Sequence, residues 1–154
     1  MDKIKVVVVG YGGMGGYHAD KIRKMDKFEL LGIYDIKDER RKAAEKNGIR
    51  AYNSFEEVLA DDSAELITCA TYNDCHKEIV IRALEAGKNV ISEKPVTLCS
   101  EDLEEMIAVA EKTGRLFTVH QNRRWDNDYR TIKNIYSEAV VNLVVCDMCY
   151  RGVD

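Results

Sequence analysis

The segment GYGGMGG, which begins at Gly10, has the residue types and spacing of a phosphate-binding turn. It contains the pattern Gly10-x-Gly12-x-x-Gly15, directly after the apolar run 6–9 and ahead of a helical pattern. Gly10 permits a tight turn, Gly12 lets the backbone approach a pyrophosphate, and Gly15 lets the helix lie close to the strand. The N–H groups at the start of that helix favour a bound anion. The segment therefore predicts a dinucleotide site that also includes Tyr11, Gly13 and Met14.

An acidic residue stands where such a site needs one. Asp35 ends the second apolar run, 20 residues after the last glycine of the pattern, and we include its neighbour Ile36 in the site. A carboxylate here accepts hydrogen bonds from the adenosine ribose and repels a 2′-phosphate, which favours NAD over NADP. Arg40 and Arg41 keep NADP as an alternative. The other interpretation of Asp35 is a turn or cap residue ahead of a helix that starts near Asp38.

The segment NVISEKPVT, residues 89–97, ends an apolar run in two charges and the only proline of the chain. Proline cannot donate a hydrogen bond to a sheet, and it disfavours helical backbone at the preceding Lys94. An ammonium group at a strand end can hydrogen-bond a substrate hydroxyl and stabilise the negative charge that develops on it. The simpler alternative is a solvated lysine where a strand stops.

Cys146 and Cys149 form a CxxC pair, which is found in zinc sites and in redox centres. The alternating pattern around them is typical of a strand, where this spacing places the two thiols on opposite faces. The sequence holds no second pair of ligands to complete a site. It therefore predicts no metal site.

The composition sets the broad class of the protein. The chain has 154 residues, of which 45% are hydrophobic and 32% charged, and its net charge is −4. These values are typical of a globular protein with a buried core, and they give no sign of a nucleic-acid partner. No apolar run approaches the roughly 18 residues of a membrane span, and the segment MDKIKVVVVG does not have the pattern of a secretory h-region. Five cysteines scattered through apolar segments suit a reducing compartment, so we expect a cytoplasmic protein.

The elements that position these residues follow an alternating pattern. Continuous apolar runs, typical of strands covered on both faces, lie at residues 6–9, 28–35, 65–71, 89–94 and 116–121. Helical patterns separate them, and three of these end in Gly48, Gly87 and Gly114, each suited to a left-handed helix end. Ser54, Asn73 and Ser100 are expected helix caps. The pattern predicts an α/β fold, a doubly wound parallel sheet with helices on both faces, in which ligands bind beyond the carboxyl ends of the strands.

Read together with ATYNDCH (70–76) and HQNRRWDNDY (120–129), these segments resemble the Gfo/Idh/MocA family of NAD(P)-dependent oxidoreductases, which act mostly on sugars, inositols and related polyols. The resemblance covers nearly the whole chain, and Glu-Lys-Pro is its most specific mark. It implies a Rossmann fold in which Lys94 is the catalytic residue, reaching over the nicotinamide to the substrate hydroxyl. It further implies cofactor contacts by Glu93, Thr71, Tyr72 (where the family commonly has proline), Asn73, His76 and Gln121, and a substrate pocket bordered by Arg123 and Trp125. For His76 the alternative is packing under the loop, and for Arg123 and Trp125 it is hinge packing.

The chain departs from the family at its end. Family members usually continue into a second α/β domain that supplies an aspartate and a histidine one helical turn apart, and no such pair follows here. The resemblance therefore implies a fragment: a Rossmann domain at 1–122, then a connecting helix and the first strand of a truncated substrate domain at 123–154. The expected function is hydride transfer between a nicotinamide cofactor and a sugar, inositol or related polyol. The alternatives are a non-catalytic dinucleotide-binding module, such as a redox sensor, or another Rossmann reductase.

The last segment of the chain, residues 140–154, is too apolar for a solvated tail. A lone strand leaves backbone groups unpaired and an apolar face wet. Pairing with the same segment of a second chain would relieve this, and disorder with aggregation is the alternative. The pattern favours self-association through this strand.

Overall fold

The computed structural model describes residues 2–138, which form two compact units. The first unit reaches His120 and the second begins at Gln121. The predicted strand at 140–154 lies outside the described residues, and so does the cysteine pair within it. The division at 122/123 into a Rossmann domain and the start of a substrate domain stays a prediction.

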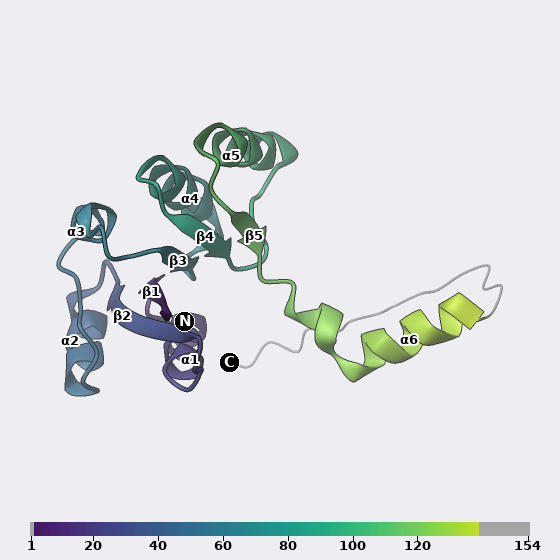
Figure 1. Cartoon of the computed structure of the whole chain (residues 1–154), viewed down its shortest axis with the longest axis horizontal. Coiled ribbons are helices and arrows are strands. Elements are labelled where there is room, and N and C mark those ends of the chain that lie inside the picture. The colour runs from purple at the N-terminus through teal and green to yellow at the C-terminus, as the bar shows by residue number, and fades with distance from the viewer. Residues whose placement is uncertain (1, 139–154) are drawn as a thin grey trace. The chain divides into compact units, whose positions relative to one another are not determined.

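A five-stranded parallel sheet forms the centre of the first unit (Figure 1). Its strands are β1 (Ile4–Val9), β2 (Phe28–Tyr34), β3 (Leu66–Cys69), β4 (Asn89–Ser92) and β5 (Phe117–Val119). They follow the order β2-β1-β3-β4-β5, and a single parallel bridge between Ile33 and Ala51 extends the sheet beyond β2. This arrangement confirms the predicted doubly wound α/β fold.

Helices connect the strands and cover them. The first unit contains α1 (Gly13–Ile22), α2 (Asp38–Lys46), α3 (Phe55–Ala60), the 3₁₀ turn η1 (Asn73–Cys75), α4 (His76–Glu85) and α5 (Ser100–Thr113). The second unit contains η2 (Asn122–Trp125) and α6 (Asn127–Glu138). Among the described residues, no helix has the length and apolar character that crossing a membrane requires.

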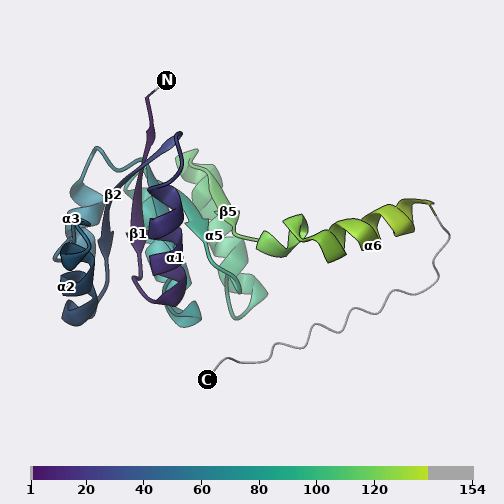
Figure 2. The same cartoon turned by 90° about the horizontal axis from the view of Figure 1, so that it is seen from below.

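The interior strand β1 buries both of its faces, which explains the uninterrupted run of valine at residues 6–9. Val7 and Val9 belong to one core cluster, with buried residues of α3, α4 and α5. Val6 and Val8 belong to a second cluster, with buried residues of α1 and α2. The helices that contribute to the two clusters form two layers, above and below the sheet in Figure 1. Figure 2 shows α1 in front of the strands and α5 behind them. A single strand thus anchors both layers of helices.

The helix ends follow the expected chemistry in part. Gly48, Gly87 and Gly114 all have positive φ angles, as predicted for left-handed helix ends. The Ser54 side chain accepts a hydrogen bond from the Glu57 N–H and caps α3. The other two predicted caps are wrong. Asn73 begins η1 because the chain makes a 3₁₀ turn before α4, and Ser100 is already the first residue of α5, after the cap position Cys99.

The five strands end level with one another, which places their following loops along one edge. Their last residues are register partners across the sheet, in the order Tyr34, Val9, Cys69, Ser92 and Val119. All four strands after β1 end one or two residues earlier than predicted, so Asp35, Thr71, Lys94 and Gln121 lie in loops. From β1 the chain adds β2 on one side, and then β3, β4 and β5 on the other. The strand order therefore reverses between β1 and β3, and ligands bind at this point in this class of fold.

Adjacent glycines of α1 should respond in opposite ways to alanine. A Cβ at Gly15 would overlap the carbonyl oxygen of Gly10, whereas a Cβ at Gly16 would meet no atom within 4 Å. We expect Gly15→Ala to lower the free energy of unfolding by about 3 kcal/mol or more. Gly16→Ala should raise it by up to about 1 kcal/mol, because alanine favours helix. Urea unfolding followed by circular dichroism measures both, and equal stability of the two variants would contradict the contact.

Two leucines test where the core lies. Leu84 on α4 is fully buried, whereas Leu98 in the loop before α5 is 71% exposed. Leu84→Ala should lower the free energy of unfolding by about 2–5 kcal/mol, since it leaves a cavity in the core. The same substitution at Leu98 should change it by less than about 0.5 kcal/mol. Thermal or urea denaturation gives both values, and a comparable loss at the two positions would refute the core assignment.

Candidate functional site

A cavity of about 550 Å³ opens beyond the carboxyl ends of β1, β2 and β3. Eight of the residues predicted to bind a cofactor line it: Gly10, Gly12, Gly13, Met14, Asp35, Ile36, Thr71 and Tyr72. They come from three loops that are distant in the sequence. The level ends of the strands bring these loops together.

The glycine turn is shaped by contacts that exclude side chains. Gly10 has a φ angle of 89°, and a Cβ there would lie 2.5 Å from the carbonyl oxygen of Ala70. Its N–H donates to the Tyr34 carbonyl oxygen at 2.7 Å, which ties the turn to β2. Gly15 packs directly on Gly10, so that α1 starts immediately beyond the end of β1. The roles predicted for these two glycines follow from this geometry.

The start of α1 brings two glycines and Met14 to the cavity. Gly12 occupies the cap position and has no side chain to offer, and the helix begins with Gly13 and Met14, both of which line the cavity. The first N–H groups of a helix have no partner within the helix, and they lie at the positive end of its dipole. This surface suits a phosphate group, and a Cβ at Gly12 would reduce the space available to it.

Asp35 is a fixed part of the cavity wall. The residue is 3% exposed, and one carboxylate oxygen accepts the Tyr11 N–H at 2.7 Å. The other oxygen accepts the Lys37 N–H at 2.9 Å, which forms the turn that leads into α2. Asp35 therefore has the turn role that the simpler interpretation gave it. The same two bonds hold its carboxylate at the cavity, where it can also accept hydroxyl groups.

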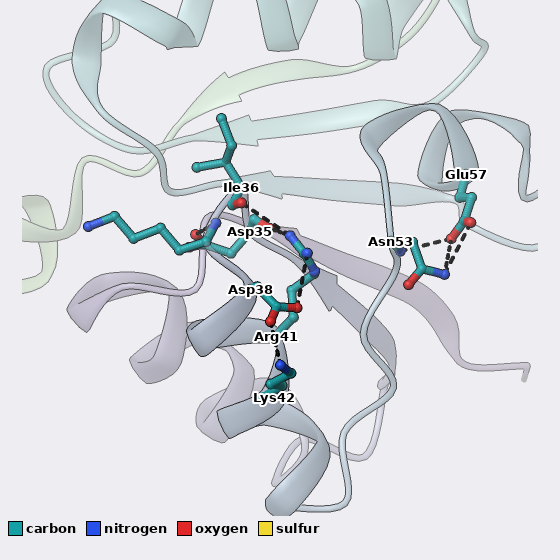
Figure 3. A network of polar contacts seen from close by, with 8 residues as sticks. Asp35, Ile36, Asp38, Arg41, Lys42, Asn53 and Glu57 are labelled. Carbon is teal, nitrogen blue, oxygen red and sulfur yellow. Dashed lines mark hydrogen bonds and ion pairs between the residues drawn. The ribbon is translucent and has the colours of Figure 1, made fainter.

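The two arginines that follow have different positions. Arg41 donates to the carbonyl oxygens of Asp35 and Ile36, at 2.7 and 3.2 Å, and pairs with Asp38 (Figure 3). Arg40 instead lines the cavity, with its guanidinium 3.2 Å from the Asp35 carboxylate and over Gly12. The hydrogen bond to Asp35 raises the pKa of the Arg40 guanidinium above its usual value. Arg40 therefore lies at the cavity beside Asp35, whereas the Arg41 guanidinium is bonded to two backbone carbonyl oxygens and to Asp38.

The rest of the cavity wall was not predicted. It includes Phe55 and Arg82, whose guanidinium lies 5.0 Å from the Phe55 ring centroid and 2.7 Å from the Glu56 carboxylate. The rings of Tyr34 and Phe55 stack at 6.2 Å. Such residues carry no local motif, because their position depends on how α3 and α4 pack on the sheet. In the sequence, only the apolar pattern of α3 and α4 indicates which face of each helix packs on the strands.

The loop after β3 divides into exposed and buried residues. Thr71 and Tyr72 line the cavity, whereas Asn73 is exposed and lies outside the cavity wall. The His76 side chain is fully buried, with one ring nitrogen 3.1 Å from the Pro95 carbonyl oxygen and the other 3.2 Å from that of Thr71. His76 thus connects the loops after β3 and β4 from beneath, which matches the packing interpretation of this residue.

The loop after β4 begins with a buried carboxylate. One oxygen of Glu93 lies 2.6 Å from Nε2 of His18 and 2.9 Å from Nδ1 of His120, and the other accepts the Lys94 N–H at 3.2 Å. Burial acts to raise the pKa of Glu93, but the hydrogen bonds from the two histidines lower it below its usual value. Lys94 is half-buried, and its peptide bond to Pro95 is cis. Neither histidine was predicted, since they lie far from Glu93 in the sequence.

The remaining predicted residues, Gln121, Arg123 and Trp125, lie in the second unit. Arg123 pairs with Asp126 at 2.7 Å, and Trp125 is 80% exposed. The cavity of the first unit is lined without them.

Comparisons with known proteins agree with this geometry. The model of the Gfo/Idh/MocA oxidoreductase family, described by its NAD-binding Rossmann fold, matches residues 4–121. The chain is 34% identical over 140 residues to the NADP-dependent scyllo-inositol 2-dehydrogenase of Bacillus subtilis, covering 90% of this chain and 39% of that protein. It is 30% identical over 141 residues to the myo-inositol 2-dehydrogenase of Thermotoga maritima, covering 90% and 41%.

A solved structure shows the same likeness. The crystal structure of an NAD-binding protein from Listeria innocua superposes with a TM-score of 0.87 at 48% identity, covering 90% of this chain and 40% of that one. The chain thus spans about two fifths of the length of the relatives it matches. Because the family model matches residues 4–121, most of the chain, the chain belongs to the Gfo/Idh/MocA oxidoreductases and contains their nicotinamide-dinucleotide-binding Rossmann fold.

Proposed function

We propose that the chain binds NAD for an oxidoreductase that transfers hydride between this cofactor and an inositol, sugar or related polyol. The observation that carries the proposal is the convergence of the glycine turn, the start of α1 and Asp35 on one cavity. The polyol is inferred from the relatives, two of which are inositol dehydrogenases by name.

Two groups of residues would hold the cofactor. The backbone N–H groups of Gly12, Gly13 and Met14 would bind the pyrophosphate, because they lie at the start of a helix and the two glycines bring no side chain of their own. Asp35 would accept the hydroxyls of the adenosine ribose. The fit is supported by the close contacts at Gly10 and Gly15, where a Cβ would collide with backbone. When bound, the cofactor supplies the hydride acceptor or donor, which no amino-acid side chain provides.

The position of Asp35 favours NAD over NADP. Its carboxylate is 3% exposed and held by two backbone N–H groups, so it cannot turn away from a ribose 2′-phosphate. Arg40 could attract such a phosphate, but it is already paired with Asp35 and its side chain is 34% exposed. Attraction by a half-exposed arginine is screened by solvent, whereas repulsion by a buried carboxylate is screened much less.

Lys94 would act on the substrate. It follows Glu93 at the carboxyl end of β4, on the same edge of the sheet as the glycine turn. Its ammonium would hydrogen-bond the reacting oxygen and stabilise the negative charge there as hydride leaves the carbon. The Glu93 carboxylate, which accepts the Lys94 N–H, would hold this part of the loop in place.

The cofactor preference can be measured by calorimetric titration of NAD and NADP. We expect tighter binding of NAD, and we expect Asp35→Ala to narrow the gap by about 1–3 kcal/mol, roughly 5- to 150-fold in the ratio of the Kd values. Asp38→Ala is the matched control, because Asp38 is exposed and pairs with Arg41 and Lys42. Equal or tighter binding of NADP to the unaltered chain would exclude this role of Asp35.

The role of Lys94 can be tested with scyllo- and myo-inositol at high protein concentration, following NADH absorbance. Lys94→Ala should lower the rate by about 10²- to 10⁴-fold and leave the Kd for NAD unchanged, because the side chain acts on the reacting oxygen. Lys112→Ala, on the exposed last turn of α5, should change neither value. An unaltered rate in Lys94→Ala would exclude this assignment, and NAD binding with no turnover would favour a non-catalytic module or an inert fragment.

A further inference from the structure

Three side chains from distant parts of the first unit meet around one oxygen atom. His18 lies in α1, and Glu93 lies in the loop after β4. His120 directly follows β5 and is the last residue of the first unit. One atom from each residue, His18 Nε2, a Glu93 carboxylate oxygen and His120 Nδ1, all lie within 4.8 Å of one another. We refer to these residues as the His–Glu–His cluster. None of them lines the dinucleotide cavity.

The two imidazole rings approach the carboxylate by their edges. Their centroids are 4.9 Å apart and their planes are inclined by 73°, so the rings do not stack. Nε2 of His18 and Nδ1 of His120 lie 2.6 and 2.9 Å from the same oxygen of Glu93. In a tetrahedral zinc site, ligand bonds of about 2.0–2.2 Å place neighbouring donor atoms about 3.3–3.6 Å apart. Small shifts of the side chains would therefore admit an ion between them.

The burial and charge of the cluster favour a cation. The Glu93 side chain is 7% exposed, that of His18 12% and that of His120 33%. A buried charge in a protein is normally paired or bound to a metal, and the ring of His120 leaves a route from solvent. The second oxygen of Glu93 is held by the Lys94 N–H, as ligating carboxylates commonly are. Two imidazoles and one carboxylate are ligands that zinc, cobalt, nickel and ferrous iron accept.

We propose that the His–Glu–His cluster is a binding site for a divalent transition-metal ion. The ion would be held by His18 Nε2, His120 Nδ1 and Glu93, and its remaining positions would be open. Each ring would then carry its proton on its other nitrogen, Nδ1 in His18 and Nε2 in His120, because a ligating nitrogen must be unprotonated. Through Glu93, the ion would attach the loop that bears Lys94 to α1.

The chain contains its own control, because it has three histidines and the third, His76, is buried elsewhere between two carbonyl groups. The metal-free full chain, labelled with ¹⁵N, is titrated with Zn²⁺ without cofactor, and the imidazole nitrogens are followed by long-range proton–nitrogen correlation. We expect the signals of His18 and His120 to shift with one equivalent of Zn²⁺, with Nε2 and Nδ1 as the respective ligands, while His76 stays unchanged. Thiols that bind zinc elsewhere would not produce this pattern.

Variants then test two of the three ligands by calorimetry. His18→Ala and Glu93→Gln should each weaken this Zn²⁺ binding at least about tenfold, a loss that even outer partners of a metal site cause. Glu104→Gln, the same change on the exposed face of α5, should have no effect. The proposal is overturned if Zn²⁺ leaves His18 and His120 unshifted, if His76 shifts equally, or if Glu93→Gln binds as tightly as the unaltered chain. Because no NAD is present, none of these results bears on cofactor binding.

Discussion

The contact of Gly15 with the Gly10 carbonyl is the constraint on which the site depends. With no side chain between them, α1 begins at the very end of β1, and its first N–H groups open into the cavity. The same turn donates its Gly10 N–H to Tyr34 and its Tyr11 N–H to Asp35. The N–H groups at the start of α1 and the Asp35 carboxylate are therefore positioned by one piece of backbone. Steric exclusion places them, and hydrogen bonds then hold them.

Asp35 would combine a structural role with the role proposed for it in cofactor binding. Two backbone N–H groups fix its carboxylate, and they leave lone pairs that can accept further donors. Arg40 supplies one such donor, at a distance of 3.2 Å. A ribose hydroxyl would join or replace this arginine without any rearrangement of the backbone. The turn that the carboxylate forms is thus also what prepares it for a ligand, because no loop must become ordered on binding.

Local patterns were enough to predict the fold and much of the cavity. The run of valines, the glycine pattern and the spacing to Asp35 each reflect a contact between neighbouring segments, so they are visible in sequence. Phe55, Arg82 and the pair His18 and His120 were missed, because what they touch is decided by the packing of helices on the sheet. For His76 the sequence left cofactor contact and packing both open, because the motif does not reveal that both ring nitrogens lie beside backbone carbonyl oxygens. Contacts between segments that are distant in the sequence are thus the hardest to predict from local patterns.

The run of four valines in β1 affects how the register of this strand against its neighbours is specified. A strand with one polar face resists slipping by one residue, because the slip would bury polar groups. Residues 6–9 are all valine and both faces are buried, so a slip of this strand would bring one valine into the place of another. It would, however, move the glycine turn that follows β1 by about 3.3 Å along the strand direction. The register is therefore specified by the residues at the two ends of this run: Lys5, which a slip in one direction would move into the buried place of Val6, and Gly10, whose N–H donates to the Tyr34 carbonyl oxygen.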